Sequence, residues 1–172
     1  MNTMKTKLCL LILLIVGLSV QLSANPINGL LERIDKGASK KFVIEFKKGA
    51  DDFFELDQKG TKVVVRGNNY VNIATGINWY LKYYAGIQLS WNGMQAKLPQ
   101  VLPPVSRKER HETSLSLRYD FNYCTYSYTM AFWDWERWEK EIDWMALHGI
   151  NLPLAAVGQE LSLIHISEPT RH

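Results

Sequence analysis

The sequence lacks the cysteines from which a disulfide-stabilised fold would be built. Its 172 residues contain only Cys9 and Cys124, and Cys9 lies in an apolar N-terminal segment that we expect to be removed. The remaining chain therefore keeps one cysteine, which excludes an intramolecular disulfide. Glycosylation sites are lacking as well, because no asparagine is followed two positions later by serine or threonine, the pattern that a lysosomal enzyme normally carries.

An excess of one charge is also lacking. The chain has 20 Lys and Arg against 17 Asp and Glu, for a net charge of +3, and two of the lysines lie in the N-terminal segment. The basic residues Arg107, Lys108 and Arg110 are interrupted by Glu109, so we interpret them as a solvated linker and predict no nucleic-acid partner. With 47% hydrophobic residues, the chain has enough apolar side chains for a core.

The first 24 residues have the pattern of a signal peptide. Lys5 and Lys7 precede an apolar run over residues 8–20, and Leu-Ser-Ala at 22–24 supplies small residues for cleavage. A run of about a dozen residues is short for a membrane span, which needs about 20. We expect export and no membrane association after cleavage, with a signal anchor as the alternative. The missing glycosylation sites favour a bacterial periplasmic or extracellular location over a lysosomal one.

Residues 25–105 have the pattern of a small α/β domain. The expected elements are a helix over 27–34, a strand over 41–47, a hairpin formed by 53–57 and 61–66, a helix of about 15 residues from Asn69, and a strand over 87–91. This region contains no cluster of carboxylates, no metal-ligand spacing and no phosphate loop. We therefore interpret it as structural, with a domain boundary near residues 105–114 after Pro103 and Pro104.

Residues 115–160 predict a strand, a loop, an amphipathic helix and a second strand. Apolar and polar residues alternate over 115–122, as in a strand. Between Asp134 and His148 the period becomes helical. The predicted buried arc of that helix contains Trp135, Trp138, Ile142, Met145 and Ala146, and the predicted solvent face contains Glu136, Arg137, Lys140, Glu141 and Asp143. A short apolar run over 150–156 follows, which completes a βαβ unit of parallel strands.

The stretch RYDFNYCTYSYTMAFWDWERWEKEIDWMALHGINLPLA, followed by GQE, resembles the start of the catalytic barrel of the α-N-acetylglucosaminidases, glycoside hydrolase family 89. A fainter resemblance over about 42–105 covers the small domain that precedes this barrel in the family. The resemblance implies an α/β fold, in which a small sandwich-like α/β domain over 25–105 is followed over 113–160 by the first βαβ unit of a truncated (β/α)8 TIM barrel.

Ligand sites of such barrels lie at the carboxyl ends of the strands. Alternation on the first strand predicts that Arg118, Asp120, Asn122 and Cys124 share the inward face, with Arg118 and Asp120 either forming a buried neutralising pair or lining the pocket. The resemblance implies that Asn122 and Cys124 line the pocket for the terminal sugar.

The remaining candidates come from the loop after the first strand and from the end of the second. Of the loop aromatics, which either stack on sugar rings or cover the barrel, Tyr126 is our candidate. Gln159 and Glu160 are expected to contact the sugar or anchor a loop. The resemblance places both catalytic glutamates on later strands, beyond residue 172, and implies no metal and no cofactor.

Beyond Glu160 the sequence LSLIHISEPTRH departs from the family pattern, and we interpret 161–172 as a non-native tail. A (β/α)8 barrel needs about 250 residues, so we predict that this polypeptide alone is inactive. The full protein is expected to be an exo-acting, retaining glycosidase that removes terminal α-linked N-acetylglucosamine from glycans. The alternatives are a barrel glycosidase specific for another hexosamine or a uronic acid, and a secreted carbohydrate-binding protein without catalytic carboxylates.

Overall fold

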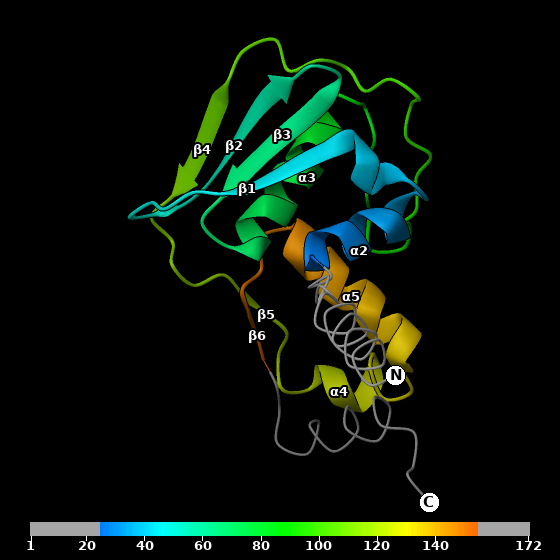
Figure 1. Cartoon of the computed structure of the whole chain (residues 1–172). Helices are drawn as coiled ribbons and strands as arrows, with labels where there is room; N and C mark the ends of the chain where they lie inside the picture. The colour runs from blue at the N-terminus through cyan, green and yellow to red at the C-terminus, as the bar shows by residue number, and fades with distance from the viewer. Residues whose placement is uncertain (1–24, 155–172) are drawn as a thin grey trace, which may run out of the picture.

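The computed structural model describes residues 25–154. They form a four-stranded mixed sheet with helices against one face, followed by a long helix and a short pair of parallel strands (Figure 1). The expected signal peptide, the last two residues of the predicted strand 150–156, Gln159, Glu160 and the tail 161–172 lie outside the described residues.

The first sheet has the strand order β1-β3-β2-β4, with β1 parallel to β3 and the other pairs antiparallel. Its elements are α2 (Pro26–Ile34), a 3-10 turn (Ala38–Lys41), β1 (Phe42–Phe46), β2 (Asp52–Lys59), β3 (Lys62–Gly67), α3 (Tyr70–Tyr83) and β4 (Glu109–Thr113). Both predicted helices begin where their caps indicate, because the side chains of Asn25 and Asn69 accept hydrogen bonds from the first-turn amides of Ile27 and Asn72. The hairpin of β2 and β3 is confirmed.

Two predictions for this region were wrong. The residues expected to form a strand over 87–91 contain only an isolated bridge between Ser90 and Gly93. The basic stretch interpreted as a linker overlaps the beginning of β4, which pairs with β2. Its sequence lacks the alternating apolar residues that identify a strand. Arg110 lies opposite Glu55, and His111 stacks on Phe54 with ring centroids 4.9 Å apart.

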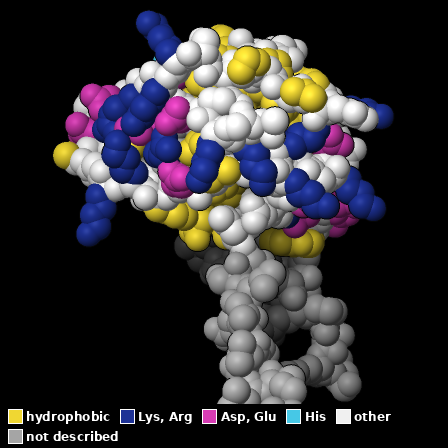
Figure 2. Space-filling view, turned by 45° about the horizontal axis from the view of Figure 1, so that its top comes forward, with side chains coloured by type: hydrophobic (Ala, Val, Ile, Leu, Met, Phe, Trp, Pro, Cys, Tyr) yellow, Lys and Arg dark blue, Asp and Glu magenta, His cyan; other side chains and the backbone are white. Residues whose placement is uncertain are grey.

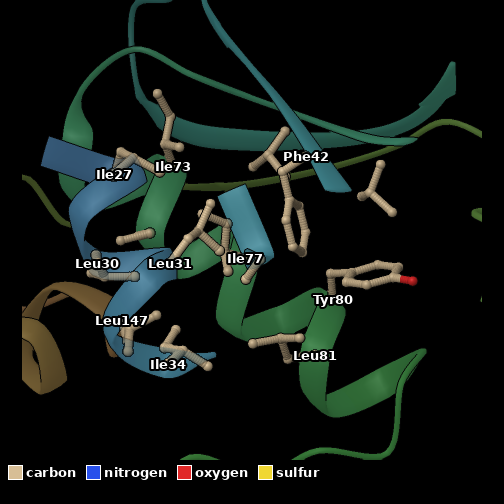
Figure 3. Close-up of a cluster of buried hydrophobic side chains, with 14 of the residues drawn as sticks. Ile27, Leu30, Leu31, Ile34, Phe42, Ile73, Ile77, Tyr80, Leu81 and Leu147 are labelled. Carbon is tan, nitrogen blue, oxygen red and sulfur yellow. The ribbon is translucent and has the colours of Figure 1, made fainter. Parts of the chain in front are cut away.

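The core lies between this sheet and its helices (Figure 3). It is formed by Ile27, Leu30, Leu31 and Ile34 of α2, Ile73, Ile77, Tyr80 and Leu81 of α3, and Phe42, Phe54, Leu56, Val63 and Val65 of the strands. Gly76 allows the close approach of α3 to the sheet, since a Cβ there would lie 2.8 Å from Val65 Cγ1.

The other face of the sheet carries charged side chains, and Lys, Arg, Asp and Glu residues intermingle on the surface in Figure 2. Glu55, only 2% exposed, lies at the centre of one cluster. Lys47, Lys108 and Arg110 contact its carboxylate at 2.7, 3.0 and 3.2 Å. Burial opposes the ionisation of Glu55, but the hydrogen bonds from these three cations outweigh it and lower its pKa to about 2.

Glu55 makes the stability of this domain dependent on pH. Its usual pKa is 4.5, and the folded value is about 2, so the ionised carboxylate stabilises the fold fully above the higher value and loses this effect as pH falls toward the lower one. We expect Glu55→Gln to lower the free energy of unfolding by about 2 kcal/mol at neutral pH. Urea unfolding of both proteins should show this difference shrinking below pH 4.5, and a difference that is constant with pH would contradict the assignment.

The second part of the chain contains β5 (Tyr119–Asp120), α4 (Thr125–Tyr128), α5 (Trp135–Leu147) and β6 (Leu152–Pro153). The predicted βαβ arrangement of parallel strands is confirmed, although each strand is only two residues long. Pro153 does not interrupt the pairing of β6 with β5, because the amides of Leu152 and Leu154 donate to the carbonyls of Arg118 and Asp120. The nitrogen of Pro153 lies on the opposite edge of β6, which pairs with no other strand among residues 25–154.

The predicted limits of α5 are confirmed. Asp134 caps its first turn by accepting from the amide of Arg137 at 2.9 Å, and Gly149, with φ of 80°, follows its end. The predicted buried arc is only partly correct. Trp138 and Met145 are buried, but Trp135 and Ile142 are 43% and 46% exposed.

Glu136 and Lys140 of the predicted solvent face are exposed, but Glu141 and Asp143 of the same face are buried, and Asp143 contacts the first domain. Asp143 accepts two hydrogen bonds from Arg33 of α2, at 2.6 and 2.7 Å, and Leu147 lies fully buried in the core cluster. The backbone carbonyl of Leu147 also accepts from Asn78 of α3 at 3.1 Å. The long helix of the second part, α5, is therefore packed onto the first domain (Figure 1). Within residues 25–154, no helix has the length and hydropathy to cross a membrane.

Candidate functional site

The candidate sugar site lies where β5 ends. The strand stops at Asp120, and the next residue, Phe121, has φ of 73°, a left-handed conformation that is rare for a bulky side chain. This turn interrupts the alternation on which the predicted inward row of side chains depended. Asp120 accepts a hydrogen bond from the amide of Phe121 at 2.8 Å, so the turn begins with the carboxylate of the last strand residue.

Asn122 fixes the segment that follows. Its Oδ1 accepts from the amides of Cys124 and Thr125, at 2.9 and 3.1 Å, and from the Thr125 hydroxyl at 3.2 Å. These bonds close the turn that leads into α4. Asn122 is exposed, and its amide nitrogen is a hydrogen-bond donor that these turn-closing bonds do not use.

Cys124 and Tyr126 have different environments. Cys124 is an exposed free thiol at the start of α4. Tyr126 is half-buried, and its hydroxyl donates to the backbone carbonyl of Leu154, at the end of β6. It therefore joins the turn after β5 to the neighbouring strand. We define residues 122–128 as the rim turn.

The predicted role of Arg118 was wrong, because its side chain leaves the strand face and contacts the first domain. Its guanidinium donates to Asp52 of β2 at 2.8 Å, to Asn72 of α3 at 3.3 Å and to the carbonyls of Leu115 and Gly149. Burial opposes the ionisation of Asp52, but the hydrogen bonds with Arg118, Asn72 and Asn68 and the positive charge of Arg118 together outweigh it and lower the pKa of that carboxyl. The predicted alternative of a neutralising pair with Asp120 is excluded as well.

A cavity of about 210 Å³ lies beside the ion pair between Arg118 and Asp52. Its lining includes Trp79 and His111 of the first domain and His148 after α5. This cavity lies at the amino end of β5, whereas the rim turn follows its carboxyl end. Arg118 is held there by four acceptors, so we interpret the arrangement as a junction between the two parts of the chain.

Sequence reasoning missed a cluster of aromatic side chains beneath the rim turn. Its ring contacts run from Phe121 to Tyr126 (6.4 Å between centroids), Tyr126 to Trp138 (6.5 Å), Trp138 to Trp133 (5.1 Å) and Trp133 to Trp91 (6.2 Å). We call these five residues the aromatic chain. The density of tryptophan and tyrosine between 123 and 138 was the available signal, but nothing in the sequence indicated that Trp91 joins them.

Other aromatic residues near the rim turn are exposed. Tyr123, Tyr128 and Phe132 are 79%, 61% and 97% exposed. Leu115, Leu117 and Tyr119, which alternate with the predicted inward row, are more than half exposed too. The described residues supply one long helix beside β5, which does not cover this face. Among residues 25–154 there is no group of side chains arranged to hold a metal ion.

Comparison with known proteins gives matches over both parts of the chain. Residues 25–104 match the family model described as the alpha-N-acetylglucosaminidase N-terminal domain, and residues 118–168 match the model of the tim-barrel domain. The second match extends eight residues beyond Glu160. The human protein named alpha-N-acetylglucosaminidase is 42% identical over 126 residues, which are 73% of this chain and 17% of the human protein.

Solved structures give the same result. A family 89 glycoside hydrolase from Clostridium perfringens, in complex with PUGNAc, has a TM-score of 0.75 at 40% identity, covering 81% of this chain and 16% of that one. A structure of the same protein described as a complex with its substrate GlcNAc-alpha-1,4-galactose has the same score, identity and coverage. The chain thus spans about one sixth of the length of these relatives. It belongs to the alpha-N-acetylglucosaminidase family, glycoside hydrolase family 89.

Proposed function

We propose that the protein containing this chain is an exported glycosidase that releases terminal α-linked N-acetylglucosamine from glycans with retention of configuration. The observation that carries the proposal is the likeness over β5, α5 and β6 and the preceding domain to a structure whose substrate is described as GlcNAc-alpha-1,4-galactose. Hydrolysis with retention uses two carboxyl groups about 5–5.5 Å apart. Our proposal places both on later strands, so the described residues supply binding groups.

In this proposal β5 and β6 are the first two strands of a (β/α)8 barrel that further chain completes. Their carboxyl ends then face the sugar pocket, which brings the rim turn to its edge. The exposed apolar residues Leu115, Leu117 and Tyr119 become the surface that later elements cover. The chain alone lacks the remaining strands and should release no sugar.

We propose a separate role for each candidate residue of the rim turn and of the segment after β6. Asn122 uses its oxygen to close the turn and offers its amide nitrogen to a sugar hydroxyl. Cys124 forms part of the pocket wall. Tyr126 supports the turn through its bond to Leu154, so we assign it an anchoring role. Gln159 and Glu160 follow β6 and are proposed as further sugar contacts on the same edge.

The activity is tested with the full-length protein and a chromogenic α-N-acetylglucosaminide, and NMR of the first product identifies its anomer. Release of N-acetylglucosamine as the α-anomer is expected. Cleavage of other glycosides alone would contradict the substrate assignment. Binding of the glycoside without release would instead support the carbohydrate-binding alternative.

Asn122→Asp tests the proposed contact, because aspartate retains the oxygen that closes the turn and removes the amide donor. We expect KM to rise about tenfold, the loss of roughly one hydrogen bond, with an unchanged melting temperature. Asn122→Ala removes both functions and should also lower the melting temperature. An unchanged KM in Asn122→Asp would show that this nitrogen does not contact the sugar.

A further inference from the structure

Trp91 reaches from the first domain to α5. The backbone of Ser90 and Gly93 forms a pair of 3.0 Å hydrogen bonds, which places Trp91 and Asn92 at the tip of a tight turn. From there the Trp91 indole nitrogen donates to Glu141 Oε2 at 2.7 Å. Trp91 belongs to the first domain by sequence, yet its indole nitrogen forms a hydrogen bond with a residue of the second part of the chain.

Glu141 and Arg137 form an ion pair, and Trp91 contacts both of its members. Glu141 is 2% exposed, and the same Oε2 atom contacts Arg137 at 2.9 Å. The guanidinium of Arg137 lies 4.5 Å from the ring centroid of Trp91 and 4.0 Å from that of Trp133. Trp91 therefore both donates to the buried carboxylate and covers the cation that neutralises it.

The contact continues to the rim turn without interruption. Trp133 packs edge-on against Trp138, whose ring stacks with Tyr126. Tyr126 lies within the rim turn and bonds to Leu154 at the end of β6. A side chain of the first domain is thus joined through packed rings to the segment that carries Asn122.

We propose that Trp91 is a positioning residue for the terminal sugar. It does not touch the sugar; it fixes Arg137 and Trp133, and through the aromatic chain it fixes the rim turn on which Asn122 and Cys124 lie. The proposal rests on the proposed function, in which the rim turn binds the sugar. The first domain accordingly contributes to substrate affinity as well as to stability.

The test uses the full-length protein with Trp91→Ala and Trp91→Phe and the same chromogenic glycoside. A displaced rim turn weakens contacts made equally in the ground state and the transition state, which raises KM and leaves kcat unchanged. We expect Trp91→Ala to raise KM about tenfold with kcat within about twofold. Trp91→Phe keeps a ring over Arg137 and loses the bond to Glu141, so its KM should rise about threefold.

Trp79→Ala is the matched control, since Trp79 packs on Phe54 and His111 of the first domain and lies outside the aromatic chain. It should lower the melting temperature without changing KM. If Trp91→Ala behaves like this control, with KM unchanged and only the active fraction reduced, Trp91 is structural and the proposal is overturned.

A second measurement on this chain does not depend on activity. The amides of Thr125, Ser127 and Met130 are hydrogen-bonded within or beside the rim turn, and in Trp91→Ala they should exchange with solvent about tenfold faster while those of β2 and β3 are unchanged. Unchanged exchange in the rim turn would overturn the positioning role. If the unaltered full-length protein released no N-acetylglucosamine, the proposed function would fail and the exchange result would still decide the effect of Trp91 on the turn.

Discussion

Arg118→Met should lower the free energy of unfolding of the chain by about 3 kcal/mol, the cost of leaving a partly buried charge without its partner. Methionine retains much of the apolar stem but loses the donors to Asp52, Asn72 and the Gly149 carbonyl. Asp52 and Arg118 are each 17% exposed at the side chain, so water replaces these bonds poorly. Urea unfolding followed by tryptophan fluorescence measures the change.

Two variants make this result specific. Arg118→Lys keeps the charge but loses the forked geometry, and an intermediate loss is expected. Lys140→Met removes a cation that also forms a 2.8 Å ion pair, with Glu136, but at an exposed site. It should change stability by less than about 1 kcal/mol. If Arg118→Met were no more destabilising than Lys140→Met, the junction would not depend on Arg118.

Leu147→Ala should have an effect of similar size. Leu147 belongs to α5 but has no exposed surface and lies in the core cluster with residues of α2 and α3, as Figure 3 shows. Truncation removes buried apolar surface and leaves a cavity, for a loss of about 3 kcal/mol. Thermal and urea unfolding should both report it.

Ile142→Ala is the control for Leu147→Ala, since it makes a comparable truncation on the same helix. Ile142 is 46% exposed, so its replacement should change the stability of this chain by about 0.5 kcal/mol or less. The helical pattern of the sequence predicted the opposite for Ile142, which it placed on the buried arc. Equal losses at the two positions would contradict the observed orientation of α5.

Local signals in the sequence were sufficient for most helix boundaries. Asn25, Asn69 and Asp134 each supply a side-chain oxygen to a first-turn amide, and the hairpin around Lys59 and Gly60 follows from its turn residues. These features depend on neighbours within a few positions, so a single sequence contains the information.

The errors concern side chains whose partners are distant in the sequence. Glu141 and Asp143 have the polarity of a solvent face, yet they are buried because Trp91 and Arg33 reach them from 50 and 110 positions away. The strand Glu109–Thr113 was interpreted as a linker for the same reason. Polarity alone does not distinguish a solvated charge from one that is paired across an interface.

At the candidate site, some sequence-based predictions agree with the structure and one does not. The resemblance selected Asn122 and Cys124, the aromatic character of the loop selected Tyr126, and the structure places all three in the segment after β5. The prediction that side chains alternate between the two faces fails at Phe121, the residue before Asn122, because Phe121 adopts a positive φ. No local pattern indicates that conformation, which bulky residues rarely adopt.

Hydrogen exchange of the α5 amides in this chain tests most directly whether packing on the first domain stabilises α5. A helix of 13 residues is marginal alone in water, and the pair β5 and β6 adds only two residues on each side. We predict that the amides of α5 between Trp138 and Leu147 exchange with about the same free energy as those of α3. Exchange of α5 at the rate of an unstructured peptide, with α3 still protected, would contradict the account.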